Sequence, residues 1–387
     1  MSIQPTHMPF SSLGLSAPLL QAITDQQYAQ PYPIQVEAIP PILAGKDLLG
    51  IAQTGSGKTA SFVWPILELL QNKKFAAPRH IKALVLVPTR ELAMQVSEVF
   101  DLFGAKLPTR IKSVAVFGGV NINVQIEALL RAQVLVATPG RLLDLVSSRN
   151  VFLSEVEVLV LDEADKMLNL GFQNEMRDIF DLLPRKRQNL LFSATLNDNV
   201  EGIKSILLHD PVKIEVKAEQ ANVDLIKQTA YRVDEERKGP FLRYLITQHN
   251  MSQVLVFTSS TRRADNVVTK LNKNGIQAAA LHGDKSQTAR MEALQRFKSG
   301  KLRVLVATDL ASRGIDIQFL PYVINYELPR SPTDYVHRIG RTGRAESSGE
   351  AISLIGAEEE HHFKVIQKKM KKQVELLESK EIDLQGY

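Results

Sequence analysis

The stretch DLLGIAQTGSGKTASF, residues 47–62, decides the fold. Its apolar start is typical of a strand, its centre is a glycine-rich turn, and its end is typical of a helix. A phosphate-binding loop requires this context, because backbone N–H groups in the turn and the positive end of the helix then face an anion. Lys58 would reach the β and γ phosphates, and the Thr59 hydroxyl would hold Mg²⁺. We therefore predict a nucleotide site, although Ala52 replaces the first glycine of the GxxxxGK[ST] pattern; the alternative is a glycine-rich turn without a ligand.

A second apolar run, VLVLDEAD at residues 158–165, ends in three carboxylates. Ligands of open parallel sheets lie beyond the carboxyl ends of the strands, so Asp162 and Glu163 should arrive beside the phosphate loop. Asp162 is the better candidate for the Mg²⁺ shell, partly through water because magnesium keeps much of its hydration. Glu163 would orient or deprotonate the attacking water. An acidic loop that caps the next helix is the alternative.

Short apolar runs alternate with helix-like stretches along the whole chain, which predicts parallel sheets with crossover helices. The chain has 387 residues, more than the roughly 250 to 300 at which one core stops growing, so we expect two α/β domains. The expected strands are 47–51, 83–87, 114–117, 134–136, 157–161 and 189–192 in the first half and 254–257, 277–281, 302–307, 322–325 and 351–354 in the second.

The domain boundaries follow from this rhythm and its interruptions. We predict an N-terminal domain over 1–209, a linker over 210–228, a C-terminal domain over 229–356 and a Lys-rich helical tail over 357–387. In the tail, apolar residues recur at helical spacing and lysines crowd the middle; we expect this helix to pack on the second domain. The apolar positions are Phe363, Ile366, Met370, Val374 and Leu377, and the lysines are Lys368, Lys369, Lys371 and Lys372.

Composition excludes several classes of protein. Hydrophobic residues make up 44% and charged residues 23%, which argues against a disordered, fibrous or membrane-embedded chain. The first Lys or Arg is Lys46, so the positive start of a signal peptide is missing, and we expect no signal peptide and a cytoplasmic location. The absence of cysteine excludes disulfides, thiolate zinc sites and a cysteine nucleophile. A net charge of +5 leaves the partner open.

Seven motifs occur in order between Phe10 and Gly356: AQTGSGKT, PTREL, TPGR, DEAD, SAT, ATDLASRGID and HRIGRTGR. Together they resemble the DEAD-box RNA helicase family. The resemblance implies two tandem RecA-like domains, each a parallel sheet flanked by helices, with the short helical tail after them. It also implies ATP and Mg²⁺ as cofactors and RNA as partner.

The resemblance assigns adenine recognition to Phe10 and to Gln35 of PYPIQ. A glutamine amide offers one donor and one acceptor, which complements the N6 and N7 edge of adenine; Phe10 would stack on the base or pack beside it. The alternatives are a core aromatic and a helix-surface amide. The expected nucleotide contacts are Phe10, Gln35, Ala52, Gln53, Thr54, Gly55, Ser56, Gly57, Lys58, Thr59 and Asp316.

Arginines at spacings of three in HRIGRTGR should fall on adjoining parts of one helix face. By resemblance Arg341 and Arg344 are arginine fingers, worth on the order of 10³ to 10⁵ in rate; an exposed basic helix is the alternative. The expected catalytic residues are Lys58, Asp162, Glu163, Arg341 and Arg344. The resemblance also implies a relay from Ser193 and Thr195 of SAT to Asp165 and His337, with helix-capping hydroxyls as the alternative. Gln287 and Arg290 are candidates for interdomain contacts.

Several expected loops follow strands and carry charge, hydroxyl groups or glycine, which suits phosphate and sugar oxygens rather than base edges. RNA binding should therefore be independent of sequence, and ordinary turn chemistry is the alternative for each loop. Ser260 stands where the family usually has Thr and keeps the hydroxyl. The expected RNA contacts are Arg90, Gly119, Thr138, Arg141, Ser260, Gly283, Thr308 and Arg313.

These expectations describe an RNA-stimulated ATPase that closes two domains on ATP and RNA. The family implies that the bound strand is bent, that short duplexes separate locally, and that hydrolysis resets the enzyme. An ATP-gated RNA clamp or ribonucleoprotein-remodelling scaffold with little unwinding is the alternative, and a DNA-directed motor is a second one. We expect a monomer without a membrane partner, with ribosome-assembly or RNA-decay proteins as candidate partners.

Overall fold

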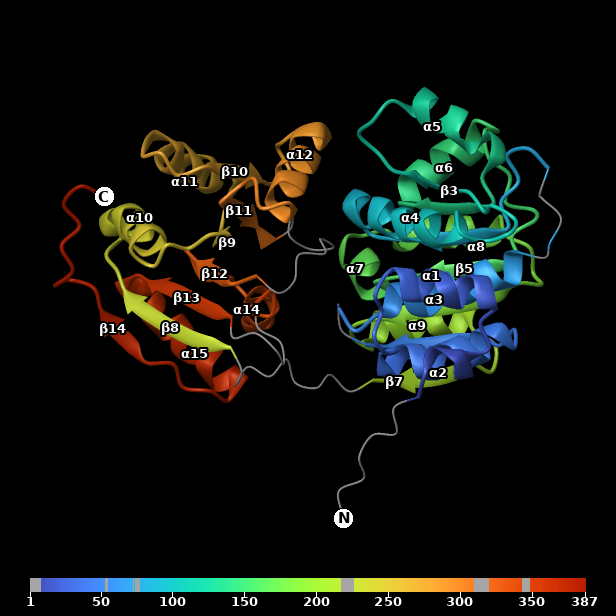
Figure 1. Ribbon diagram of the computed structural model, residues 1–387, viewed down its shortest axis with the longest axis horizontal. Helices are drawn as coiled ribbons and strands as arrows, with labels where there is room; N and C mark the ends of the chain where they lie inside the picture. The colour runs from blue at the N-terminus through green and yellow to red at the C-terminus, as the bar shows by residue number, and fades with distance from the viewer. Residues whose placement is uncertain are drawn as a thin grey trace, which may run out of the picture. The chain divides into compact units, whose positions relative to one another are not determined.

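The computed structural model describes residues 8–52, 55–71, 73, 77–216, 226–309, 320–342 and 349–387. The chain forms two compact units, Met1–Ala218 and Glu219–Tyr387, called unit 1 and unit 2 below. Each unit contains a seven-stranded sheet whose strand pairs are all parallel. Helices cover both faces of each sheet (Figure 1).

The sheet of unit 1 has the order β3-β4-β2-β5-β6-β1-β7. One face packs on α1 to α4, and the other packs on α6 to α9. The strands are β1 (Leu48–Ile51), β2 (Ala83–Leu86), β3 (Ser113–Val116), β4 (Val134–Ala137), β5 (Val158–Leu161), β6 (Gln188–Ser193) and β7 (Val212–Glu215). The helices are α1 (Ala17–Asp25), α2 (Pro33–Leu43), α3 (Lys58–Leu70), α4 (Arg90–Gly104), α5 (Ile122–Ala128), α6 (Pro139–Ser147), α7 (Ala164–Asn169), α8 (Gln173–Asp181) and α9 (Asp198–Leu207).

The sheet of unit 2 has the order β10-β11-β9-β12-β13-β8-β14. Its strands are β8 (Lys227–Arg232), β9 (Val254–Thr258), β10 (Ala278–Leu281), β11 (Val304–Thr308), β12 (Tyr322–Asn325), β13 (Glu350–Ile355) and β14 (Leu376–Glu378). Its helices are α10 (Lys238–Gln248), α11 (Thr261–Lys273), α12 (Gln287–Lys298), α14 (Pro332–Ile339) and α15 (Glu360–Met370).

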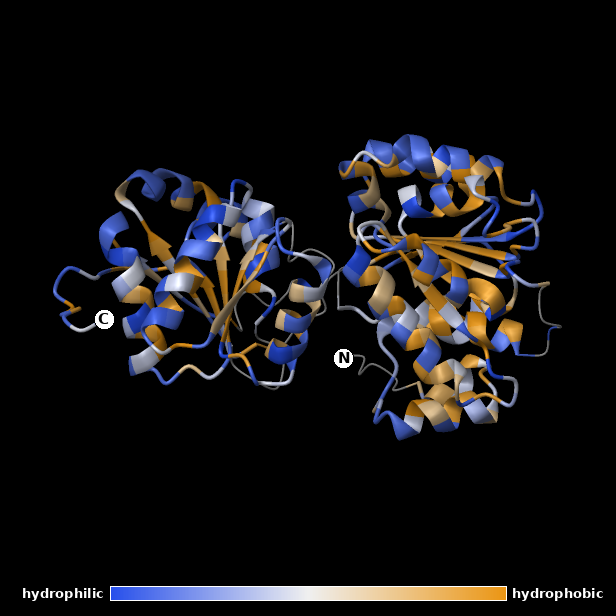
Figure 2. Cartoon of the chain, turned by 90° about the horizontal axis from the view of Figure 1, so that it is seen from above, coloured by the Kyte–Doolittle hydropathy of each residue, from blue (hydrophilic) through white to orange (hydrophobic). Residues whose placement is uncertain are grey.

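Burial on both faces explains why the inner strands are almost continuously apolar. Successive side chains of a strand point to opposite faces, so Leu48 joins the core beside α1 to α4 while Leu49 joins the core beside α6 to α9. Figure 2 shows hydrophobic strands in each unit between helices that carry both hydrophobic and hydrophilic residues. The alternation of apolar runs and helix-like stretches, which predicted two α/β domains, therefore corresponds to the strands and helices that the structure contains.

The predicted linker over 210–228 is wrong at both ends. Residues Val212–Glu215 form β7, which pairs with β1, and β8 already begins at Lys227. Both segments are rich in charged residues because β7 is an edge strand and β8 is only partly buried. Their polar positions hid the strand pattern in the sequence.

The predicted helical tail is correct only in its first part. Phe363 and Ile366 of α15 are buried in a cluster with Tyr335 and Ile339. The helix ends at Met370, and Lys371 follows in the left-handed conformation with φ of 56°. Val374 and Leu377 therefore lie beyond the helix, and Leu377 belongs to β14, which pairs with β8. A spacing of three to four residues did not reveal where the helix ends, since no glycine or proline marks that point.

Among the described residues, no helix is both long enough and apolar enough to span a lipid bilayer.

Candidate functional site

The loops of the predicted nucleotide site leave the carboxyl ends of three adjacent strands, β5, β6 and β1. The phosphate loop follows β1, the acidic motif follows β5, and Ser193 ends β6. Carboxyl ends of parallel strands share one edge of the sheet, which is where open α/β sheets bind ligands. The fold therefore brings these three motifs of unit 1 together.

The phosphate loop has the backbone conformation that its glycines allow. Gly55 and Gly57 adopt φ of 84° and 89°, and α3 begins at Lys58 directly after them. A Cβ atom at Gly57 would lie 2.7 Å from Gln35 Nε2 and 2.9 Å from Tyr32 Cδ2, so a side chain does not fit there. The helix N-terminus provides the N–H groups and the partial positive charge that an anion needs. Gln53 and Thr54 lie outside the described residues.

Lys58 and Asp162 are buried at this helix start. The Lys58 ammonium donates a hydrogen bond to the Ala52 carbonyl oxygen at 2.7 Å, and Asp162 is 2% exposed. Burial raises the pKa of Asp162 to about 6, the charge of Lys58 opposes this rise, and the charge of Glu163 adds to it. The buried Oδ1 atom of Asp162 has no hydrogen-bond partner among the residues that the structure describes. A carboxylate oxygen in this condition suits a hydrated Mg²⁺ ion that also contacts phosphate.

The described residues contain no cluster of three or more His, Asp or Glu side chains that could hold a metal alone. Protein groups would then supply only part of the shell, from the Asp162 carboxylate and the Thr59 hydroxyl, with water and phosphate oxygens completing it. Thr59 is the second residue of α3.

Glu163 has an unusual backbone conformation. It precedes α7 with φ of 56° and ψ of 47°, in the left-handed region that few residues other than glycine adopt. Its side chain is nearly buried, and Lys166 donates a hydrogen bond to Oε1 at 2.7 Å. Backbone conformations of this kind cost about 1 to 3 kcal/mol and are concentrated at functional sites. The position of Glu163 beside Asp162 is compatible with the orientation of a water molecule.

The Ser193 hydroxyl bonds the backbone of Thr195, and the Thr195 hydroxyl bonds the acidic motif. Thr195 Oγ1 donates to Asp165 Oδ2 at 3.2 Å, and Ser193 Oγ donates to the Thr195 carbonyl oxygen at 2.7 Å. The N-cap of α9 is Asn197, whose side chain accepts from the Val200 N–H at 3.0 Å. The alternative of helix-capping hydroxyls is therefore wrong. His337, the other end of the predicted relay, belongs to α14 of unit 2.

The predicted adenine residues contact the phosphate loop and the helix that follows it, Gln35 at Gly57 and Phe10 at Trp64 of α3. Gln35 is fully buried; its Oε1 accepts from the Tyr32 N–H at 2.9 Å and its Nε2 donates to the Gly57 carbonyl oxygen at 3.2 Å. A helix-surface amide is thus the wrong description. Phe10 packs edge-on against Trp64, with ring centroids 5.6 Å apart. Tyr32 was missed in the sequence, although its position three residues before Gln35 could have identified it as a helix-start partner.

The predicted RNA loops of unit 1 follow β2, β3 and β4, which are neighbours in the sheet. Gly119 has φ of 82°, and a Cβ atom there would overlap the Arg90 guanidinium, so these two residues are in contact. Arg141 donates to Gln125 Oε1 at 3.0 Å and to the Val120 carbonyl oxygen at 3.1 Å. Thr138 is the buried N-cap residue of α6.

The predicted residues of unit 2 lie on comparable loops. Ser260 is the N-cap of α11, where its Oγ accepts from the Arg263 N–H at 3.2 Å. Thr308 ends β11 and Gly283 follows β10. Gln287 begins α12, and Arg290 lies one turn later. Arg313, Asp316 and Arg344 lie outside the described residues.

The expectation of three arginines on one helix face is wrong. Helix α14 ends at Ile339, Gly340 is its C-cap, and Arg341 lies in the turn beyond. Arg338 is 2% exposed and binds both carboxylate oxygens of Asp309, at 2.5 and 2.7 Å. It is a buried structural cation, whereas Arg341 is partly exposed.

The chain is similar to proteins of known family. The DEAD/DEAH box helicase family matches residues 32–203, and the helicase conserved C-terminal domain matches residues 237–346. The ATP-dependent RNA helicase CshA of Listeria monocytogenes is 40% identical over 371 residues, which cover 96% of this chain and 70% of that protein. The DEAD-box ATP-dependent RNA helicase CshA of Geobacillus kaustophilus is 40% identical over 375 residues, or 97% of this chain and 79% of that protein.

Solved structures agree with this match. Dbp5 of S. cerevisiae bound to RNA and ADP BeF3 has a TM-score of 0.81 at 32% identity, covering 96% of this chain and 95% of that one. A DEAD box protein from the hyperthermophile Methanococcus jannaschii has a TM-score of 0.55 at 37% identity, covering 96% and 99%. The two parallel sheets thus confirm tandem RecA-like domains. The chain belongs to the DEAD-box family of ATP-dependent RNA helicases and is an ATP-hydrolysing enzyme.

Proposed function

We propose that this helicase closes its two units on Mg²⁺-bound ATP and an RNA strand, bends the strand so that short duplexes separate locally, and resets by hydrolysing ATP. The observation that carries the proposal is the buried Oδ1 of Asp162, which has no hydrogen-bond partner in the described part of the chain and lies beside Lys58 at the start of α3. A buried carboxylate oxygen without a hydrogen-bond partner is costly unless a ligand compensates it. Mg²⁺ with the phosphates of ATP is the ligand that this donor set fits.

The proposal gives each group of unit 1 a task. Lys58 and the N–H groups of the phosphate loop bind the β and γ phosphates. Asp162 and Thr59 hold the Mg²⁺ shell, which neutralises charge that develops on the transferred phosphoryl group. Glu163, fixed by its ion pair with Lys166, orients the attacking water. Gln35 would present its amide to adenine.

In this proposal, unit 2 supplies the remaining contacts to ATP. Arg341, with Arg344, stabilises the charge of the transferring phosphoryl group, and Asp316 meets the ribose. ATP hydrolysis should then be slow until both units engage the same nucleotide. Because ATP and RNA both favour the closed form, each should tighten binding of the other by the same factor.

RNA would lie along the loops that carry Arg90, Gly119 and Arg141 in unit 1 and Ser260 and Thr308 in unit 2. The contact between Arg90 and Gly119 supports this, because it leaves a loop without side-chain bulk beside a cation. Dbp5 is bound to RNA in its solved structure, which supports the partner class. Backbone contacts of this type predict binding that is independent of sequence and sensitive to salt. A monomeric, cytoplasmic enzyme is part of the proposal.

The test is an ATPase titration with single-stranded and duplex RNA, together with a strand-separation assay. We expect low turnover without RNA and strong stimulation with it. Lys58→Ala should lose ATP binding, whereas Glu163→Gln should retain ATP and hold RNA without turnover. RNA-stimulated turnover without separation of short duplexes would favour a clamp over an unwinding enzyme. Equal turnover with and without RNA would refute the proposed closure.

A further inference from the structure

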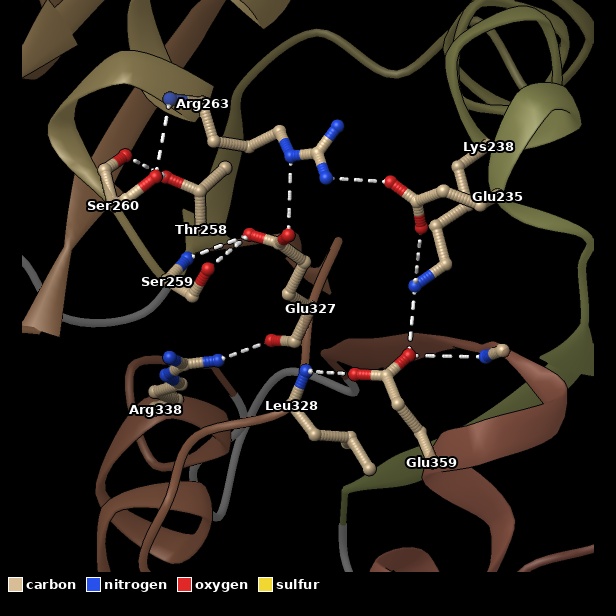
Figure 3. Close-up of polar contacts among 11 residues, drawn as sticks. Glu235, Lys238, Thr258, Ser259, Ser260, Arg263, Glu327, Leu328, Arg338 and Glu359 are labelled. Atoms are coloured by element: carbon tan, nitrogen blue, oxygen red, sulfur yellow. Dashed lines mark hydrogen bonds and ion pairs between the residues drawn. The ribbon is translucent and has the colours of Figure 1, made fainter.

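A polar network in unit 2 centres on Glu327, in the turn that follows β12 (Figure 3). Its Oε2 accepts hydrogen bonds from the Ser259 N–H at 2.8 Å and from Ser259 Oγ at 2.7 Å. Its Oε1 accepts from Arg263 Nε at 3.1 Å. The side chain is 14% exposed, so one nearly buried carboxylate holds the end of β9 and the start of α11.

The main chain of the same turn is also held on both sides. The Glu327 carbonyl oxygen accepts from Arg338 Nη1 at 2.7 Å, and the Leu328 N–H donates to Glu359 Oε1 at 3.1 Å. Glu359 in turn pairs with the buried Lys238 at 2.7 Å. Residue 327 therefore connects the loop after β9 to α14 with its side chain and its carbonyl group.

The connected elements carry residues with different tasks in the proposed function. Ser260 is next to Ser259 and is a proposed RNA contact. Arg338 also binds Asp309, which directly follows the second proposed RNA contact, Thr308. Helix α14 leads into the turn that holds Arg341. Strands β11, β9 and β12 are neighbours in the sheet, so all of these links are short.

We propose that Glu327 is a positioning residue that fixes the RNA-contacting loop at Ser260 relative to α14 and the arginine turn after it. The inference rests on the proposed function, because it requires RNA at Ser260 and phosphate at Arg341. Stability alone is a poor reason for this ion pair, since the Arg263 side chain is 38% exposed and ion pairs open to solvent contribute little to stability. A charged group that makes several hydrogen bonds is well suited to keep two ligand-contacting loops at a fixed distance.

The test replaces Glu327 with glutamine. A carboxamide has one acceptor oxygen, so its NH₂ group must face either Ser259 or Arg263, both of which donate. We expect the RNA concentration for half-maximal ATPase stimulation to rise at least tenfold. Affinity for a fluorescent ATP analogue should change less than twofold, because the phosphate loop lies in unit 1. Glu327→Asp retains two acceptor oxygens and should recover part of the loss.

Glu235→Gln is the matched control. Glu235 is the other carboxylate partner of Arg263, at 2.6 Å, with a side chain that is 50% exposed and no hydrogen bond to Ser259 in the described residues. Its half-saturating RNA concentration should stay within twofold of the unmodified enzyme. If Glu327→Gln proves unstable at the assay temperature, Ser259→Ala replaces it; that change removes only the Oγ hydrogen bond and should raise half-saturation about threefold.

The possible results distinguish a failure of the proposed function from a failure of the positioning role of Glu327. Absence of RNA stimulation in the unmodified enzyme would refute the proposed function and the role of Glu327 with it. Normal stimulation together with unchanged half-saturation in Glu327→Gln, or in its replacement Ser259→Ala, would refute the positioning role alone. An equal effect of Glu235→Gln, or a loss that only scales with the fraction of active enzyme, would also overturn it.

Discussion

Replacing Glu359 with glutamine should destabilise unit 2 because it removes the main partner of a buried cation. Lys238 is 2% exposed, and its ammonium lies 2.7 Å from Glu359 Oε2. Its second partner, Glu235, lies at 3.5 Å with a side chain that is 50% exposed. Glu359 also accepts from the Gly356 N–H at 3.0 Å and the Leu328 N–H at 3.1 Å. A glutamine at this position loses one acceptor atom and its charge.

The expected loss of unfolding free energy is limited because Glu235 remains as a second partner of Lys238. Breaking a buried ion pair from one side costs roughly 3 to 5 kcal/mol, and the remaining partner places this case at about 3 kcal/mol. For a unit of this size, 1 kcal/mol corresponds to roughly 2 to 4 °C, so the melting temperature of unit 2 should fall by roughly 6 to 12 °C. Glu378→Gln is the control, because the Glu378 side chain is 50% exposed and its ion pair with Arg232, being open to solvent, should contribute little to stability.

The pH dependence gives this prediction a second check. Burial acts to raise the pKa of Glu359, but the hydrogen bond and charge of Lys238 and the two N–H groups outweigh it and lower the pKa. A carboxylate with a lowered pKa stabilises the fold above its unfolded value, near 4.3, and loses this contribution as the pH falls through its folded value. The difference in melting temperature between the unmodified protein and Glu359→Gln, measured by calorimetry or circular dichroism, should therefore be largest at neutral pH and shrink below about pH 4. A difference that is constant from pH 7 to pH 3.5, or smaller than that of Glu378→Gln, would refute the reasoning.

Three further predictions concern the nucleotide and RNA sites. Arg341→Ala should reduce RNA-stimulated ATPase at least a hundredfold with little change in ATP affinity; unaltered turnover in a steady-state assay would remove the finger assignment. Gly57→Ala should weaken ATP binding at least tenfold, because the new Cβ would lie 2.7 Å from Gln35 Nε2, and titration with a fluorescent ATP analogue measures this. Gly45→Ala, which has the same left-handed strain with φ of 74° but open space, should affect stability only, so equal losses of affinity would contradict the steric argument. Replacing the tail lysines by glutamine should leave the salt dependence of short-RNA affinity unchanged, because Lys372 lies near Ile226 at the start of β8, opposite the strand ends that carry Ser260; a clearly shallower salt slope would show that the tail binds RNA. The lysines are Lys368, Lys369, Lys371 and Lys372.

The inner strands and the phosphate loop were predictable because their determinants are local. Burial on both faces makes an inner strand apolar along its whole length, and the loop conformation depends on Gly55 and Gly57 within a few residues of Lys58. The edge strand β7 was missed for the opposite reason. Its sequence VKIE places Lys213 and Glu215 in solvent, and a charged strand at a sheet edge resembles a linker in the sequence.

The polar contacts that organise unit 2 were not predictable, since their partners are far apart in the chain. Lys238 and Glu359 are 121 positions apart, and Ser259 and Glu327 are 68 positions apart. Nothing in the local pattern around Lys238 distinguishes a buried lysine from an exposed one, and burial of a charge depends on the partner that the fold delivers.

The arginines of the HRIGRTGR motif show the limit of spacing as a guide to function. Arg338 and Arg341 are three positions apart, which in a continuous helix would place them on one face. The helix ends at Ile339, so Arg338 lies in the helix and Arg341 lies in the turn after it, and their side chains have different surroundings. Arg338 turns into the unit, where Asp309, Asn325 and the Glu327 carbonyl oxygen satisfy its donors. The Arg338 guanidinium is thus buried and bonded to acceptors of its own unit, whereas Arg341 lies in a turn, where its carbonyl oxygen accepts from the Leu320 N–H and its side chain is partly exposed. The position at which the helix ends therefore separates Arg338, a buried structural cation, from the partly exposed Arg341, to which the proposed function assigns the transferred phosphoryl group.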